Sequence, residues 1–121
     1  MVTFNATTEF VNEKKDIIKK YRSFENEFET FKKALNVSLP DKLPKTERIN
    51  GLGDEIKIPI YKVRKIRCKS LKRGENSGLR IIYACSSCLS RVVFIEIYYK
   101  GNKANEDRNR IKKYFKGLED I

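Results

Sequence analysis

The residues that could carry chemistry lie between positions 58 and 103, where basic and aromatic side chains alternate with apolar ones. The chain contains no histidine, so proton transfer would depend on Lys, Tyr or carboxylate groups, and charge stabilisation on Lys or Arg. Such residues can cleave RNA without a metal or a cofactor, because the ribose 2′-hydroxyl itself attacks the adjacent phosphate. The protein has to hold the in-line geometry, neutralise the phosphorane and move protons.

Arg80 is the leading candidate for a phosphate ligand. It lies inside an apolar strand-like run, between Leu79 and Ile81, where a cation has to face an open surface or pair with an anion. One interpretation is an RNA phosphate bound by the guanidinium. The other is a structural salt bridge to Glu96, the single acid in the third strand-like run. The sequence leaves both interpretations open.

A dense run of basic residues precedes Arg80 and could hold an RNA backbone. Alternate residues of a strand project from the same face, so Lys62 and Arg64 can follow one phosphate path. The alternative is an edge strand whose charges protect it from pairing with another chain. The full run comprises Lys62, Arg64, Arg67, Lys69, Lys72 and Arg73.

Tyr98, Tyr99, Lys100 and Lys103 lie at and just beyond the end of the third strand-like run. A tyrosine at a strand end can offer its ring to a nucleobase for stacking. Tyr98 and Tyr99 point to opposite faces of a strand, so the alternative for one of them is a place in the core.

The three cysteines, Cys68, Cys85 and Cys88, do not predict a disulfide framework, because an odd number remains unpaired. Cys85 and Cys88 have the spacing of a zinc half-site or a redox pair. Zinc needs four ligands, and the chain offers one further cysteine and no histidine. We interpret the two serines between them as a hairpin turn, and we expect no metal site.

Composition points to a polyanionic partner. The 121 residues are enough for one domain with a modest core, and we predict a single domain over residues 1–121. The net charge is +11 and the pI is about 9.7, which favours nucleic acid first and an acidic protein second. A generally basic protein without such a partner is the alternative. No apolar run is long enough for a membrane span, and the first ten residues do not resemble a signal peptide, so we expect a cytoplasmic protein.

The N-terminal third predicts a short strand and two helices. A strand is expected over residues 2–5, followed by a helix capped at Thr7 or Thr8. After a break near residues 22–23, Ser23 can cap a second helix over residues 24–36. Spacings of four, three and four residues place one apolar stripe on that helix. The stripe is Phe24, Phe28, Phe31 and Leu35. Residues 37–57 are expected to form a long loop.

The remaining chain predicts three strands and a final helix. We expect strands over residues 58–68, with a bulge near residues 64–65, and over residues 79–85 and 91–99. A helix is expected over residues 106–116, with Gly117 as its C-cap. The predicted fold class is α+β. It consists of a twisted antiparallel sheet of about four strands with one apolar and one cationic face, an N-terminal helical hairpin on the apolar face, and a short C-terminal helix.

This order of elements resembles the RelE/ParE superfamily of toxins from type II toxin–antitoxin systems, in particular its RelE and HigB branches. The segments that carry the resemblance are TEFVNEKKDIIKKYRSF, IYKVRKIR, SGLRIIYA and VVFIEIYYKGNKANED. Their order and spacing are fairly specific together, and they cover nearly the whole chain.

The resemblance implies a cytoplasmic toxin that cleaves mRNA, usually on the ribosome, and that a cognate acidic antitoxin silences. It implies that Arg80 contacts the scissile phosphate and that Lys62 and Arg64 transfer protons or stabilise charge. Lys100 would complete the catalytic group. RNA binding would fall to Arg67, Lys69, Lys72, Arg73, Tyr98 and Lys103.

Two other functions remain open from the sequence. A ParE-like toxin would inhibit DNA gyrase by binding and would not catalyse a reaction. An RNA-binding protein without chemistry would also explain the charge and the absence of histidine. The basic residues around Arg80 favour the nuclease, because a gyrase inhibitor does not need a phosphate-transfer site.

Overall fold

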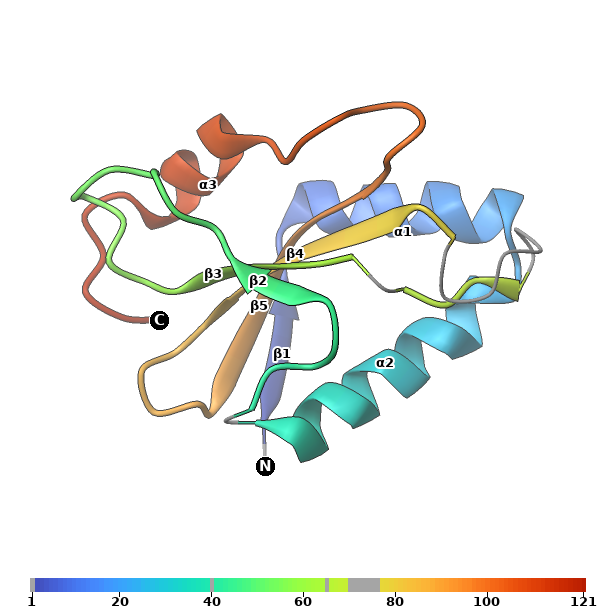
Figure 1. The fold of residues 1–121 in the computed structure, drawn as a ribbon, viewed down its shortest axis with the longest axis horizontal. Coiled ribbons are helices and arrows are strands. Elements are labelled where there is room, and N and C mark those ends of the chain that lie inside the picture. Colours follow the sequence, from blue (N-terminus) through green and yellow to red (C-terminus); the bar gives the residue numbers. More distant parts are fainter. Residues whose placement is uncertain (1, 40, 65, 70–76) are drawn as a thin grey trace.

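One five-stranded mixed sheet lies at the centre of the protein (Figure 1). The computed structural model describes residues 2–39, 41–64, 66–69 and 77–121. The strand order is β1-β5-β4-β3-β2. β1 pairs parallel to β5, and the other neighbours are antiparallel. The strands are β1 (Thr3–Ala6), β2 (Thr46–Arg48), β3 (Ile60–Val63), β4 (Leu79–Cys85) and β5 (Arg91–Tyr99); the helices are α1 (Thr8–Lys20), α2 (Phe24–Ser38) and α3 (Arg108–Phe115).

The α+β class is confirmed, whereas the predicted sheet of about four antiparallel strands is wrong in two respects. The fifth strand, β2, lies inside the segment that we expected to be a loop. Its three residues are too few to form an alternating pattern, and it is held by backbone pairing to β3. The parallel direction of β1 also escaped prediction, because the partners β1 and β5 lie far apart in the sequence.

The predicted strand bounds match the structure closely only in the centre of the sheet. The predicted strands over residues 79–85 and 91–99 are confirmed residue for residue. The strand predicted over residues 58–68 is shorter, since β3 covers only Ile60–Val63. The bulge predicted near residues 64–65 and most of the loop before β4 lie outside the described residues, which do not include residues 65 and 70–76.

Local capping explains where the helices begin and end. The Thr7 side chain accepts a hydrogen bond from the Phe10 amide and caps α1, as predicted. Ser23 occupies the cap position of α2, but it makes no side-chain capping bond there and instead donates to Glu27. Asp107 caps α3, and Gly117 follows its end with a φ of 78°, a conformation that favours glycine.

An aromatic cluster joins α1 and α2 to one face of the sheet. Phe10 of α1, Phe28 of α2 and Phe94 of β5 meet with ring centroids 5.1–5.7 Å apart. Leu35 and Phe24 of α2 are buried beside them. The predicted helical hairpin and its inward-facing stripe are therefore confirmed, apart from Phe31, which is only partly buried.

The opposite face of the sheet is also buried, so the expectation of a purely cationic face is wrong. Ile111 and Phe115 of α3 pack against Ile82 of β4 and Ile95 of β5. The segment between β2 and β3 adds Leu52 and its neighbours to this second cluster. Figure 1 shows α3 on one side of the sheet and α2 on the other. α3 is amphipathic, and it covers this face because its apolar stripe is stabilised by burial against the sheet.

Three side-chain contacts fasten α3 to α1. Arg110 donates two hydrogen bonds to Glu13, at 2.8 and 2.9 Å, and Lys113 and Tyr114 both donate to Glu9. The hydrogen bond from Tyr114, followed by those from the Glu9 backbone and Lys113, lowers the pKa of Glu9 to about 2. Among the described residues, no helix is long and apolar enough to cross a lipid bilayer.

Replacing Phe28 with Ala tests the packing of the helical hairpin. Phe28 is 3% exposed and contacts three other aromatic rings besides Phe94. We expect the free energy of unfolding to fall by about 3–5 kcal/mol, because a large cavity would remain. Urea denaturation measures the change.

Val37→Ala on the same helix is the control, because Val37 is 83% exposed and its replacement should change stability by less than about 0.5 kcal/mol. Equal losses for the two variants would contradict the packing described above.

Candidate active site

Arg80 projects from the face of the sheet that carries α3, near the end of that face. It lies opposite Tyr98 on β5 and two residues from Ile82, which is paired with Glu96 on one side and Lys62 on the other. Alternation along the strands therefore places Arg80, Tyr98, Lys62 and Glu96 on one face. Opposite residues on neighbouring strands bring their side chains within contact distance.

The Arg80 guanidinium is held by backbone carbonyls. Its Nη1 donates to the carbonyl oxygens of Arg64, at 3.1 Å, and Leu79, at 3.3 Å. Among the described residues, no carboxylate forms an ion pair with Arg80. The half-buried cation therefore keeps donors for an external anion.

Glu96 is engaged elsewhere, which rules out the salt-bridge interpretation of Arg80 that the sequence left open. The Glu96 side chain is 1% exposed and pairs with the Lys103 ammonium. Its other oxygen accepts a hydrogen bond of 2.8 Å from the Asp107 amide at the start of α3. The predicted alternative of an Arg80–Glu96 salt bridge does not occur.

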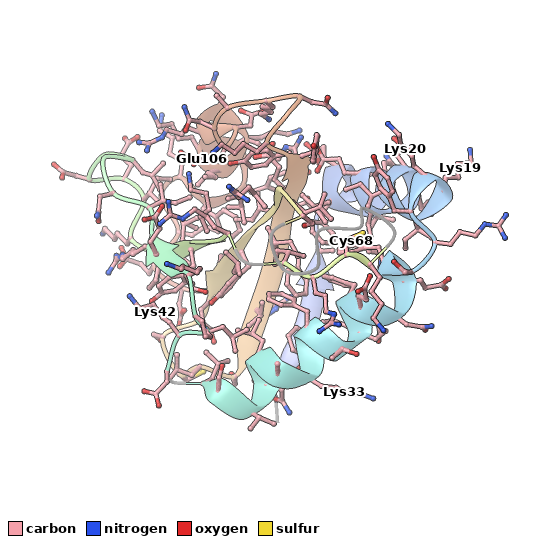
Figure 2. All side chains as sticks on the ribbon, turned by 45° about the vertical axis from the view of Figure 1, so that its right-hand side comes forward. Lys19, Lys20, Lys33, Lys42, Cys68 and Glu106 are labelled. Atoms are coloured by element: carbon pink, nitrogen blue, oxygen red, sulfur yellow. The ribbon has the colours of Figure 1, made fainter. Side chains whose placement is uncertain are left out.

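Lys62 is fixed by an acid that the sequence analysis did not single out. Its Nζ lies 2.8 Å from Oε1 of Glu106, whose side chain is 3% exposed, and Arg108 donates to the other Glu106 oxygen at 3.0 Å. Burial raises the pKa of Glu106, but hydrogen bonds from Lys62, the Glu106 backbone and Arg108 together outweigh burial and lower the pKa below its ordinary value. Figure 2 shows Glu106 beside α3, away from Lys33 of α2.

Tyr98 lies between these groups. The residue is 7% exposed, and the Lys103 ammonium lies 5.5 Å from the centre of its ring. Its hydroxyl forms no hydrogen bond with any described residue, and it is not one of the side-chain atoms sealed from solvent. Burial, followed by the charges of Glu106 and Glu96, raises the pKa of Tyr98 to about 12, against an opposing influence of Arg80.

The other predicted site residues divide between two sides of the sheet. Arg64 pairs with Glu47 of β2 at 3.4 Å, and Lys100 is exposed just beyond β5. On the side of α2, Arg67 lies 3.9 Å from Glu27, which also accepts hydrogen bonds from the Lys69 amide. Arg67 and Lys69 therefore do not join the group around Arg80. Lys72 and Arg73 lie outside the described residues.

A hollow of about 840 Å³ adjoins this group between β2, the end of β3 and the start of α3. Its size falls within the range of small-molecule and nucleotide sites. The lining is polar and carries charges of both signs, since three acids, Glu47, Glu106 and Asp107, lie among four basic and three amide residues. Arg80 and Tyr98 are not among the lining residues. The lining includes Arg48, Lys62, Lys103, Asn105, Glu106 and Arg108.

Residues 86–90 connect β4 to β5 as a hairpin, which confirms the interpretation of the two serines after Cys85. Ser86 Oγ accepts hydrogen bonds from the amides of Ser90 and Arg91. Cys88 is exposed, and hydrogen bonds with Ser90 and Ser86 lower its pKa, whereas burial raises the pKa of Cys85. Within the described part of the chain, no cluster of three His, Cys, Asp or Glu side chains could hold a metal ion.

Comparison of the chain with protein-family models, with curated proteins and with solved structures finds no match in any of the three. The chemistry of the site therefore has to be inferred from its own geometry. Within the described part of the chain, an arginine without a carboxylate partner, a lysine held by Glu106 and a tyrosine hydroxyl without a hydrogen-bond partner lie on one face of the sheet. The lysine also lines the polar hollow. Such a group can bind a phosphate and donate protons to it.

Replacing Glu96 with Gln tests the anchoring role of this carboxylate. The substitution keeps the shape and removes the charge that Lys103 and the Asp107 amide share. We expect a loss of about 1–3 kcal/mol in the free energy of unfolding, because buried charge-assisted hydrogen bonds are weakened. Urea denaturation at pH 7 provides the measurement.

Glu119→Gln is the matched control, because Glu119 pairs with Lys57 on the surface. An exposed pair contributes little, so the expected loss is under about 0.5 kcal/mol. If Glu96→Gln is no more destabilised than Glu119→Gln, Glu96 does not anchor the segment before α3.

Proposed function

We propose that this protein is an endoribonuclease toxin of the RelE/HigB type, which cleaves mRNA by metal-independent attack of the ribose 2′-hydroxyl. The observation that carries the proposal is the set of contacts made by the Arg80 guanidinium. This half-buried cation has no carboxylate partner among the described residues, although Glu96 lies two residues away across the same strand pair. A cation that is partly removed from water and lacks a counterion favours an anion beside it, and a visiting phosphate would supply that charge.

Lys62 and Arg64 support a phosphate at the same place. Both lie on β3 or directly after it, on the face of Arg80, and the Arg64 carbonyl is itself bonded to the Arg80 guanidinium. Lys62 is held by Glu106, so its ammonium is oriented before substrate arrives. In the proposed reaction Arg80 binds the scissile phosphate, while Lys62 and Arg64 neutralise the charge that builds up on the phosphorane.

The charge distribution favours a long polyanion over a small anion. Residues 42–69 contain nine basic and three acidic side chains, a large share of the net charge of +11. These residues include β2, at the edge of the sheet, and β3 beside it. RNA bound at Arg80 could continue along this edge, and its affinity would fall steeply with salt. The proposed setting is the cytoplasm, with ribosome-bound mRNA as substrate and a cognate acidic antitoxin as the silencing partner.

Arg80→Ala tests the proposal directly. We expect cleavage of mRNA in a purified translation reaction to fall about 10²–10³-fold, because one contact to the transition-state charge is lost. Thermal unfolding should be unchanged, since Arg80 bonds only to backbone carbonyls among the described residues. Arg80→Lys should recover part of the activity, because lysine keeps the charge and loses the planar fork.

Arg22→Ala is the control, because Arg22 is exposed between α1 and α2, away from the site. Full activity of Arg80→Ala would exclude Arg80 as the phosphate ligand. Inhibition of DNA supercoiling by the wild-type protein without RNA cleavage would support the ParE-like alternative. RNA binding without either activity would support a non-catalytic RNA-binding protein.

Expression in bacteria tests the toxin assignment. We expect wild-type protein made without a partner to arrest growth, and Arg80→Ala to be tolerated at the same protein level. An acidic partner should restore growth by fast, salt-sensitive association with the basic surface. Unimpaired growth with abundant, folded wild-type protein would contradict a toxin.

A further inference from the structure

We propose that the Tyr98 hydroxyl is the general acid that protonates the 5′-oxygen leaving group when the RNA backbone is cut. This inference rests on the proposed endoribonuclease activity and adds a catalytic role that differs from base stacking. The sequence offered Tyr98 as a stacking ring. In the folded protein the residue is 7% exposed with the Lys103 ammonium over its ring, and the hydroxyl oxygen is not completely sealed from solvent.

The position of Tyr98 relative to Arg80 carries the inference. The two residues are direct cross-strand partners on β4 and β5, on the face that also carries Lys62. A phosphate held by the Arg80 guanidinium would therefore lie within reach of the Tyr98 side chain. The hydroxyl has no hydrogen-bond partner among the described residues, so it can donate to a substrate oxygen without first breaking a contact in the protein.

The neighbouring donors are less suited to release a proton. Lys62 and Lys103 are each bound to a buried carboxylate, Glu106 and Glu96. Arg80 and Arg64 carry guanidinium groups, which do not give up a proton in proteins. Among the described groups on this face, Tyr98 combines a transferable proton, an accessible oxygen and the absence of a competing partner.

The charges around Tyr98 favour a proton donor over a proton acceptor. Burial opposes the phenolate most strongly, and the charges of Glu106 before α3 and Glu96 on β5 act in the same direction. The pKa of Tyr98 is therefore about 12, and the hydroxyl stays protonated at neutral pH. Arg80 on β4 and Lys103 beside the ring provide positive charge that can stabilise a phenolate for the short time after donation.

The proposed step balances without an added co-reactant. The 2′-oxygen forms a bond to phosphorus as its own proton passes to water, and the bond between phosphorus and the 5′-oxygen breaks. The departing 5′-oxygen takes the Tyr98 proton, which leaves a 2′,3′-cyclic phosphate and a free 5′-hydroxyl. The phenolate then regains a proton from water. A departing alkoxide is a stronger base than a phenolate, so the transfer is favourable even with the raised pKa.

A substrate with sulfur in place of the 5′-bridging oxygen isolates this step. A thiolate leaves without protonation, because its conjugate acid is far stronger than an alcohol. On normal RNA, we expect Tyr98→Phe to lower the single-turnover cleavage rate about 10²–10⁴-fold. On the 5′-thio substrate, the same variant should differ from wild type by less than about tenfold.

Two further variants and a thermal melt make the result specific. Tyr61→Phe removes a hydroxyl from β3 on the opposite face, where Tyr61 packs against Tyr83, and should cleave both substrates at the wild-type rate. Arg80→Ala should be impaired on both substrates, because it binds the phosphate. A thermal melt of Tyr98→Phe should match wild type, since the hydroxyl has no protein partner among the described residues.

The outcomes separate this inference from the proposed function. Suppose that wild type cleaves RNA and Arg80→Ala is inactive. If Tyr98→Phe is then impaired equally on both substrates, or is fully active on both, Tyr98 is not the general acid. The nuclease assignment stands in either case. Selective rescue of Lys100→Ala by the 5′-thio substrate, in place of Tyr98→Phe, would assign the proton to Lys100. If wild type cleaves neither substrate, the inference and the proposed function both fail.

Discussion

A buried carboxylate needs partners inside the protein, and the partners of Glu96 determine how the chain runs from β5 to α3. With 1% of its side chain exposed, Glu96 takes the Lys103 ammonium for one oxygen and the Asp107 amide for the other. The first contact fixes the turn after β5, and the second fixes the start of α3. A buried charge without such partners would cost several kilocalories per mole, so the segment that follows β5 has little freedom in where it returns to the sheet.

The same constraint leaves Arg80 available. An arginine in an apolar strand would ordinarily be satisfied by the nearest acid, and Glu96 is the acid that the adjacent strand offers. Because Lys103 and the backbone satisfy Glu96, Arg80 relies on two carbonyl oxygens. A second buried acid, Glu106, forms an ion pair with Lys62, as Glu96 does with Lys103. The two acids therefore organise the cations without neutralising the one that is best placed to bind a phosphate.

The larger apolar cluster and the proposed site lie on opposite faces of the sheet. The aromatic cluster of Phe10, Phe28 and Phe94 lies under α1 and α2, and the ammonium groups of Lys14 and Lys32 lie over its Phe28 ring. The α3 face combines a smaller apolar cluster with the polar group around Tyr98. Alternate side chains of β4 are buried in the two clusters on opposite faces of the sheet. Close packing of the side chains on the α2 side therefore helps to position the residues that β4 directs toward α3.

The sequence by itself determined the elements whose signals are local. The apolar runs predicted β4 and β5 to the residue, the spacing of Phe24, Phe28 and Leu35 predicted the inward face of α2, and the pair Thr7 and Thr8 marked the start of α1. The sequence also singled out Arg80 as an unusual cation in an apolar strand. Tertiary structure alone decided the direction of β1, the existence of β2, the second apolar face and the partner of Glu96. Each of these depends on which distant segments meet. Local patterns report which side of an element is apolar, but the pairing of charges and strands is selected by the free energy of the assembled fold.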